Sequence, residues 1–193
     1  MSGAIALLAL LVASAQETHT RWRGTVTVTG TIHEPAAYHP YKTTVTLRLR
    51  EGERTAVDGG FRVPLLSDSS TIHVEHSLFQ LDGSLICSGT GTEEIKNGPI
   101  GYLETRDDAT RYHLAIPRAF GAYACGQNRK TTGNRIVVIG LGDHEPARIE
   151  TEDSRVRVVP QSDPVMRGTF ESRKSRRAVR YEYKVEWFVT RSH

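Results

Sequence analysis

The chain has 193 residues, with 25 Lys and Arg against 22 Asp and Glu, so its formal net charge is +3 at pH 7. Hydrophobic residues make up 38% of the sequence, and charged residues of both signs are interspersed. This composition excludes an intrinsically disordered polar chain and a low-complexity scaffold, and the length fits one globular domain.

The first fifteen residues have the pattern of a secretory signal peptide. Residues 4–13, AIALLALLVA, form an unbroken apolar run, and Ala13-Ser14-Ala15 then provides an A-x-A cleavage site. The run is too short to cross a bilayer, which takes about 20 residues. We therefore expect a signal peptide at 1–15 and a single all-β domain at 16–193, periplasmic or extracellular, without a transmembrane segment. A buried N-terminal helix is the alternative.

Alternation with a period of two dominates the rest of the chain. Residues 21–33 (RWRGTVTVTGTIH) and 41–50 (YKTTVTLRLR) place apolar and polar residues on opposite faces, and they predict a hairpin across HEPAAYHP. Other strand-like stretches are separated by Gly, Pro, Asn and Asp. They are 70–81, 84–90, 111–116, 134–141, 155–159, 165–171 and 178–190.

The only two cysteines are Cys87 and Cys125. An isolated pair in an exported protein normally becomes a disulfide, so we predict a bridge between them. The chain-entropy model gives a bridge across residues 87–125 a stabilisation of roughly 4 kcal/mol. Two free thiols are the alternative.

The chain opens and closes with similar sequences. Residues 22–26 (WRGTV) resemble 166–170 (MRGTF), and the apolar pattern of 41–49 matches 181–189. Two similar hairpins are predicted, the second with a loop four residues shorter. Gly24 and Gly168 would make room for a neighbouring aromatic such as Trp187 or Tyr41. Chance similarity between two amphipathic hairpins is the alternative.

The predicted fold class is all-β: an antiparallel two-sheet β-sandwich with similar opening and closing hairpins. In residues 135–141 (RIVVIGL), four consecutive branched residues indicate a strand covered on both faces and central in the packing. Two packed sheets accommodate such a strand best. An up-and-down β-barrel is the alternative.

No motif in the sequence assigns a catalytic residue, a metal ligand or a cofactor. Residues 87–91 (CSGTG) do not match a nucleophile elbow, and 88–92 lack the Lys and helix of a phosphate-binding loop. In HVEH, a strand would place His73 and Glu75 on one face and His76 on the other, unlike helical zinc ligands. An exported hydrolase, with a site assembled in space from distant strands, is the alternative function.

One local charge concentration is a candidate anion-binding site. Arg173, Lys174, Arg176 and Arg177 lie within five residues at the predicted tip of the closing hairpin. Such a run binds anionic surfaces, and it lacks the interleaved aromatic residues that stack on nucleic-acid bases. We expect an exported, non-enzymatic binding or scaffolding module. Its partner would be an anionic polysaccharide, a lipid surface or an acidic protein, and not nucleic acid. Solvated charge that protects a sheet edge is the alternative.

Overall fold

The computed structural model describes residues 20–96, 98–106, 109–116, 120–125, 135–137, 147–149 and 164–192. The predicted signal peptide at 1–15 and the predicted strand at 155–159 lie outside these ranges. All regular secondary structure within these ranges is β-strand, and all pairs of neighbouring strands are antiparallel. The all-β, antiparallel prediction is confirmed. No helix in this part of the chain is long and apolar enough to span a membrane.

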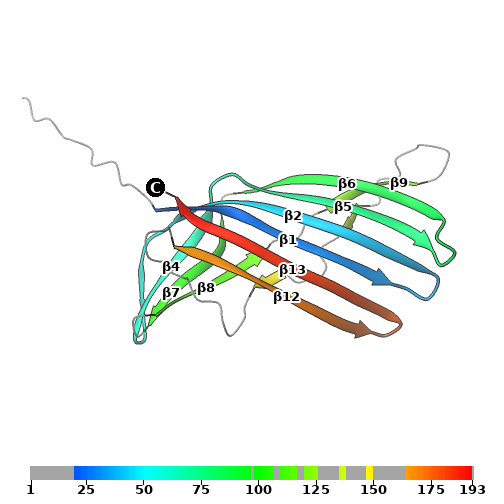
Figure 1. Cartoon of the computed structure of the whole chain (residues 1–193). Coiled ribbons are helices and arrows are strands. Elements are labelled where there is room, and N and C mark those ends of the chain that lie inside the picture. Colours follow the sequence, from blue (N-terminus) through cyan, green and yellow to red (C-terminus); the bar gives the residue numbers. More distant parts are fainter. Residues whose placement is uncertain are drawn as a thin grey trace, which may run out of the picture.

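A long sheet forms one layer of the molecule (Figure 1). Its hydrogen-bonded order is β12-β13-β1-β2-β5-β6-β9-β10. These strands are β12 (Val165–Arg176), β13 (Val179–Ser192), β1 (Arg21–His33), β2 (Ala37–Glu51), β5 (Ser70–Gln80), β6 (Leu85–Ile95), β9 (Phe120–Cys125) and β10 (Arg135–Val137).

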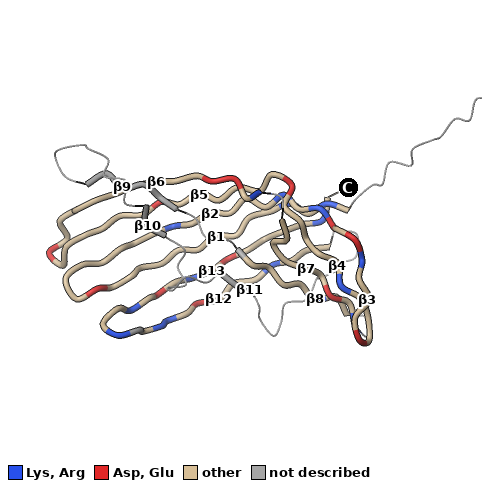
Figure 2. Tube along the Cα trace, turned by 180° about the vertical axis from the view of Figure 1, so that it is seen from behind, with Lys and Arg blue, Asp and Glu red and all other residues tan. Residues whose placement is uncertain are grey.

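A shorter set of strands packs behind one end of this sheet, as Figures 1 and 2 show from opposite sides. Its order is β3-β4-β7-β8-β11. The strands are β3 (Thr55–Val57), β4 (Gly60–Ser67), β7 (Pro99–Arg106), β8 (Ala109–Ile116) and β11 (Ala147–Ile149).

Strand β2 belongs to both layers. Residues 37–46 pair with β5, whereas Leu49–Glu51 pair with β4. The layers also meet face to face, because the Trp187 indole N–H donates to the Tyr112 hydroxyl at 2.8 Å. Two-layer packing of antiparallel strands is therefore confirmed. Since β2 joins the layers into one hydrogen-bonded path, the barrel description is compatible with the same strand order.

The period-two pattern sorts side chains onto two faces of the long sheet. The inner face is apolar, and Val26, Val28, Val45, Leu47 and Val185 are all at most 1% exposed. It packs with residues of the second layer into one hydrophobic core. The outer face of the sheet carries threonine and charged residues on β1 and β2.

The opening and closing hairpins share one register. In β1–β2, Gly24 pairs with Leu47, and in β12–β13, Gly168 pairs with Trp187, as the sequence similarity requires. Both turns have two residues, because Glu34 and Ala37 exchange backbone hydrogen bonds across Pro35-Ala36. The predicted difference in loop length is wrong: the extra residues of the opening hairpin lengthen its strands.

The prediction that glycines accommodate aromatic rings is right for Gly168 and wrong for Gly24. A Cβ at Gly168 would collide with the Trp187 ring, whereas one at Gly24 would meet the backbone of β13. The ring of Tyr41 instead lies over Gly30.

Two other expectations are corrected. Strand β10 was predicted to be central, but it lies at one end of the hydrogen-bonded strand order in the described part of the chain. An apolar run indicates that both faces of a strand are covered, and it does not indicate where the strand lies in the order of the sheet. Of the predicted strand 134–141, only Arg135–Val137 are described. The turn within HEPAAYHP is also shorter than predicted, since β2 begins at Ala37.

Candidate functional site

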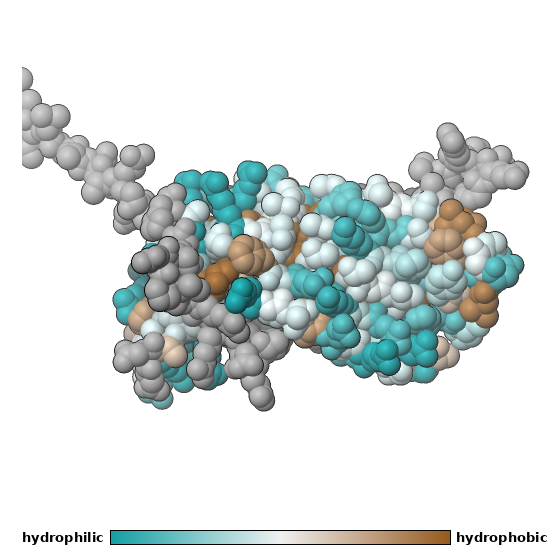
Figure 3. Space-filling view, viewed as in Figure 1, coloured by the Kyte–Doolittle hydropathy of each residue, from teal (hydrophilic) through white to brown (hydrophobic). Residues whose placement is uncertain are grey.

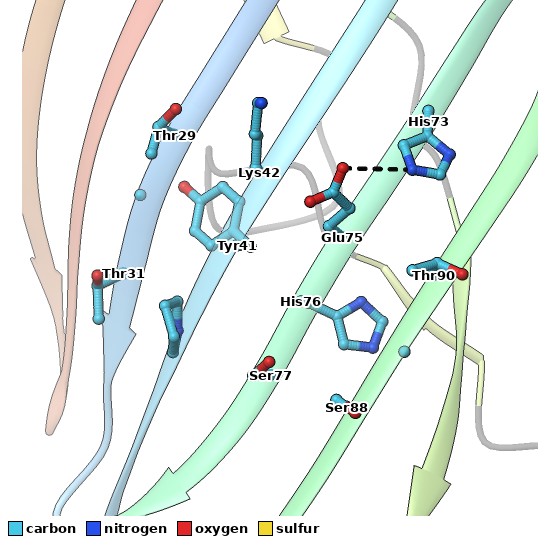
Figure 4. A pocket seen from close by; sticks show the side chains of 13 residues that line it. Thr29, Thr31, Tyr41, Lys42, His73, Glu75, His76, Ser77, Ser88 and Thr90 are labelled. Carbon is cyan, nitrogen blue, oxygen red and sulfur yellow. Dashed lines mark ion pairs between the residues drawn. The ribbon is translucent and has the colours of Figure 1, made fainter. Parts of the chain in front are cut away.

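A groove crosses the outer face of the long sheet (Figure 4). The register aligns Thr29, Lys42, Glu75 and Thr90 in one row across β1, β2, β5 and β6. The groove has a volume of about 710 Å³ and is lined mainly by hydroxyl and charged side chains.

His73 links a hydroxyl group and a carboxylate beside this groove. Its Nδ1 lies 2.8 Å from Oγ1 of Thr92, and its Nε2 lies 3.5 Å from Oε1 of Glu75. The side chains of His73 and Glu75 are 42% and 53% exposed, so water screens the pair.

The two faces of β5 separate its histidines as the sequence predicts. His73 and Glu75 lie on the outer face, while His76 is 4% exposed on the inner face beside Tyr41. Burial, and to a lesser extent the nearby His39, lowers the pKa of His76. Burial also raises the pKa of Tyr41, with a smaller contribution from Tyr183. Both groups are therefore uncharged at neutral pH. Among the described residues no three His, Cys, Asp or Glu are placed to hold a metal ion.

Three hairpin turns lie at one end of the long sheet, which we call the hairpin end (Figure 1). They are Pro35-Ala36 between β1 and β2, Leu81–Ser84 between β5 and β6, and Arg177-Ala178 between β12 and β13. The strand order makes the three hairpins neighbours.

The β12–β13 turn presents the predicted basic residues. Arg173, Lys174 and Arg177 are exposed, as is Arg180 on the returning strand. The side chain of Arg176 lies outside the described part of the structure. One carboxylate oxygen of Glu182 lies 3.5 Å from Nε of Arg173 and 3.4 Å from Nε of Arg180. A single carboxylate thus faces two guanidinium groups, and the turn keeps an excess of positive charge.

The β5–β6 turn of the hairpin end is bordered by exposed apolar side chains, with Leu81 in the turn and Leu85 and Ile86 at the start of β6. Leu81, Leu85 and Ile86 are 68%, 57% and 38% exposed. Figure 3 shows hydrophobic side chains gathered at this end of the molecule. Gly83, at φ +85°, allows the tight reversal, and the Ser84 N–H donates to the Asp82 carboxylate at 2.9 Å. Large apolar side chains at a turn are unusual, because turns favour small polar residues.

The two cysteines occupy paired positions. The β6–β9 register places Cys87 directly opposite Cys125. Paired Cα atoms in antiparallel strands are about 4.5–5.5 Å apart, within the range that disulfides span. The backbone therefore has the geometry that the predicted bridge needs.

Neither family models, curated proteins nor solved structures show a significant match to this chain.

Proposed function

We propose that this protein is an exported, non-enzymatic binding module that docks on an anionic lipid surface through its hairpin end. One observation carries the proposal: an exposed cationic turn and a turn bordered by exposed leucine and isoleucine side chains lie at the same end of the long sheet. Peripheral membrane proteins combine these two features, since cations attract anionic headgroups and apolar side chains enter the interface. A polysaccharide would use the cations but would leave Leu81 and Leu85 exposed to water.

The strength of this contact can be estimated from its parts. Each Lys or Arg near an anionic membrane contributes about 1 kcal/mol, which is about fivefold in affinity. Burying a Leu side chain contributes roughly 1.5–3 kcal/mol. The acidic residues of the hairpin end, Glu34, Asp82 and Glu182, reduce the electrostatic part. The contact is therefore reversible and sensitive to salt.

The test is sedimentation with vesicles of phosphatidylglycerol or of phosphatidylcholine at increasing salt. We expect binding only to the anionic vesicles, weakening steeply as the Debye length falls from about 10 Å at 0.1 M to about 3 Å at 1 M. Replacing Arg173, Lys174, Arg177 and Arg180 with Ser should reduce the affinity more than 100-fold, and Leu81→Ser with Leu85→Ser should reduce it at least tenfold.

The matched control removes four cations from the other end of the sheet, by changing Arg21, Arg23, Arg48 and Arg50 to Ser. This variant should bind vesicles like the wild type. Equal loss in both four-residue variants would show that net charge alone drives binding, and would overturn the assignment to the hairpin end. Salt-sensitive binding to dextran sulfate that does not depend on Leu81 and Leu85 would favour the polysaccharide instead.

Export and the disulfide belong to the same proposal. Their support is the A-x-A pattern at Ala13–Ala15 and the paired positions of Cys87 and Cys125. Mass spectrometry of the protein from its host should find a chain that starts at Gln16, and thiol labelling under denaturing, non-reducing conditions should find no free thiol. A retained Met1 would contradict export, and two labelled thiols would contradict the bridge.

A further inference from the structure

A second cluster of cations lies at the opposite end of the long sheet. Strand β1 starts at Arg21, strand β2 ends at Glu51, and their register pairs Arg21 with Arg50 and Arg23 with Arg48. All four side chains project from the outer face. We call these four residues the arginine quartet.

The quartet is electrostatically unfavourable in the absence of a partner. Like charges directly opposite one another on antiparallel strands destabilise the pair. None of the four arginines forms an ion pair with a residue that the structure describes. Arg21, Arg23 and Arg48 are exposed, so their guanidinium groups can contact an anion.

The quartet borders a small pocket. Arg21, Arg23 and Arg48 line a hollow of about 170 Å³, together with Asp68 and Ser69 of the turn between β4 and β5. The volume suits one small oxyanion with a few waters. The guanidinium group of each of these three arginines can offer two parallel N–H donors, the geometry that Arg uses for phosphate.

The turn that forms the other wall is held in place. The Asp68 N–H donates to the Arg48 carbonyl at 2.7 Å, and the Ser70 N–H donates to the Ser67 hydroxyl at 3.2 Å. Ser69 has φ +64°, a left-handed conformation that costs energy for a residue other than glycine.

We propose that this pocket binds a phosphate-class oxyanion. The site does not depend on the proposed membrane contact, because it lies at the other end of the sheet. The Asp68 carboxylate on the same wall favours an oxyanion with a hydrogen-bond donor of its own, which hydrogen phosphate has and sulfate at neutral pH lacks. The phosphate group bound here would belong either to the free ion or to a phosphate monoester.

The test is isothermal titration of the full chain with inorganic phosphate, glycerol phosphate or sulfate at constant ionic strength, with thermal unfolding in parallel. We expect phosphate or glycerol phosphate to bind at least tenfold more tightly than sulfate. The tighter of the two identifies the source as the free ion or as an esterified phosphate. Equal affinity for all three anions, or no binding, would overturn the proposal.

The decisive variant is Arg23→Gln with Arg48→Gln, matched by Arg173→Gln with Arg177→Gln at the hairpin end. The first pair should lose at least tenfold in phosphate affinity and should unfold at a higher temperature than the wild type without phosphate, because it removes an opposed pair of cations. The control should keep the phosphate affinity. A lower unfolding temperature in the first variant would show that these arginines stabilise the fold, and equal loss of affinity in the control would show non-specific attraction. Either result would overturn the site.

Discussion

At the scale of single residues, Arg177 stands out because its backbone is left-handed. It occupies a two-residue hairpin turn with φ +54°, where glycine or asparagine would fit without strain. We expect Arg177→Gly to raise the free energy of unfolding by about 0.5–1 kcal/mol and to weaken binding to anionic vesicles about fivefold. Urea unfolding and vesicle sedimentation measure the two effects. Ala178→Gly, at a position without positive φ, is the control and should not stabilise the protein. A loss of stability in Arg177→Gly would mean that the arginine side chain supports the turn.

His76 is a second single residue with a testable effect, because its protonation makes the stability of the fold depend on pH. Its pKa lies below the usual value near 6.5, mainly because the side chain is buried. The unfolded chain therefore takes up this proton at a higher pH than the folded protein. By linkage, the contribution of His76 to stability falls as the pH drops through about 6.5 towards the folded-state pKa. Urea unfolding at pH 7.5 and pH 5.0 should show this loss, and His76→Gln should reduce it. An unchanged pH dependence in the variant would exclude His76 as its source.

At the scale of elements, the packing within the β12–β13 hairpin predicts that a side chain at position 168 destabilises the protein. Gly168 pairs with Trp187 and lies under its ring. The equivalent pair in the opening hairpin is Gly24 with Leu47. Any Cβ at 168 would push the indole away from its hydrogen bond with Tyr112. We expect Gly168→Ala to cost about 1–3 kcal/mol, the usual range for overpacking. Thr169→Ala, one residue away on the exposed face, should change stability by less than about 0.5 kcal/mol. Equal effects in both variants would show that the ring moves freely.

The sequence was informative for strands that alternate cleanly, and it failed where alternation is broken. Strands β1, β5 and β13 were predicted within two residues at each end, because one face of each is buried and the other is polar, whereas the predicted strand at 165–171 ends five residues before β12 does. Strands β4 and β7 were not predicted. In β4, Pro64 interrupts an apolar run, and in β7, Gly101 does so. Read from the sequence alone, Pro and Gly indicate the end of a strand or a bulge. Only the packing of the second layer keeps these segments extended.

At the scale of the whole molecule, the candidate sites depend on register, which a linear sequence does not contain. The basic run at 173–177 was visible because its residues are consecutive. The arginine quartet was not, since Arg23 and Arg48 become neighbours only when β1 and β2 pair. Likewise, Leu81 and Arg177 reach the same end only through the strand order β12-β13-β1-β2-β5-β6. The joining of two layers by β2 also follows from tertiary pairing, because two partners share one strand.

The separation of the two cationic sites leads to a last prediction. Strand β1 runs between them, and at about 3.3 Å per residue its 13 residues extend roughly 40 Å. This distance is several times the Debye length of about 8 Å at physiological salt, so charges at one end are screened from the other. We therefore expect phosphate to bind equally well to the free protein and to the protein bound to anionic vesicles. Changing Arg23 and Arg48 should leave vesicle affinity unchanged, and changing Leu81 and Leu85 should leave phosphate affinity unchanged. Titrating phosphate with and without saturating vesicles measures this independence. A change in phosphate affinity on vesicle binding would show that the quartet also contacts the membrane, and would place both sites on one docking surface.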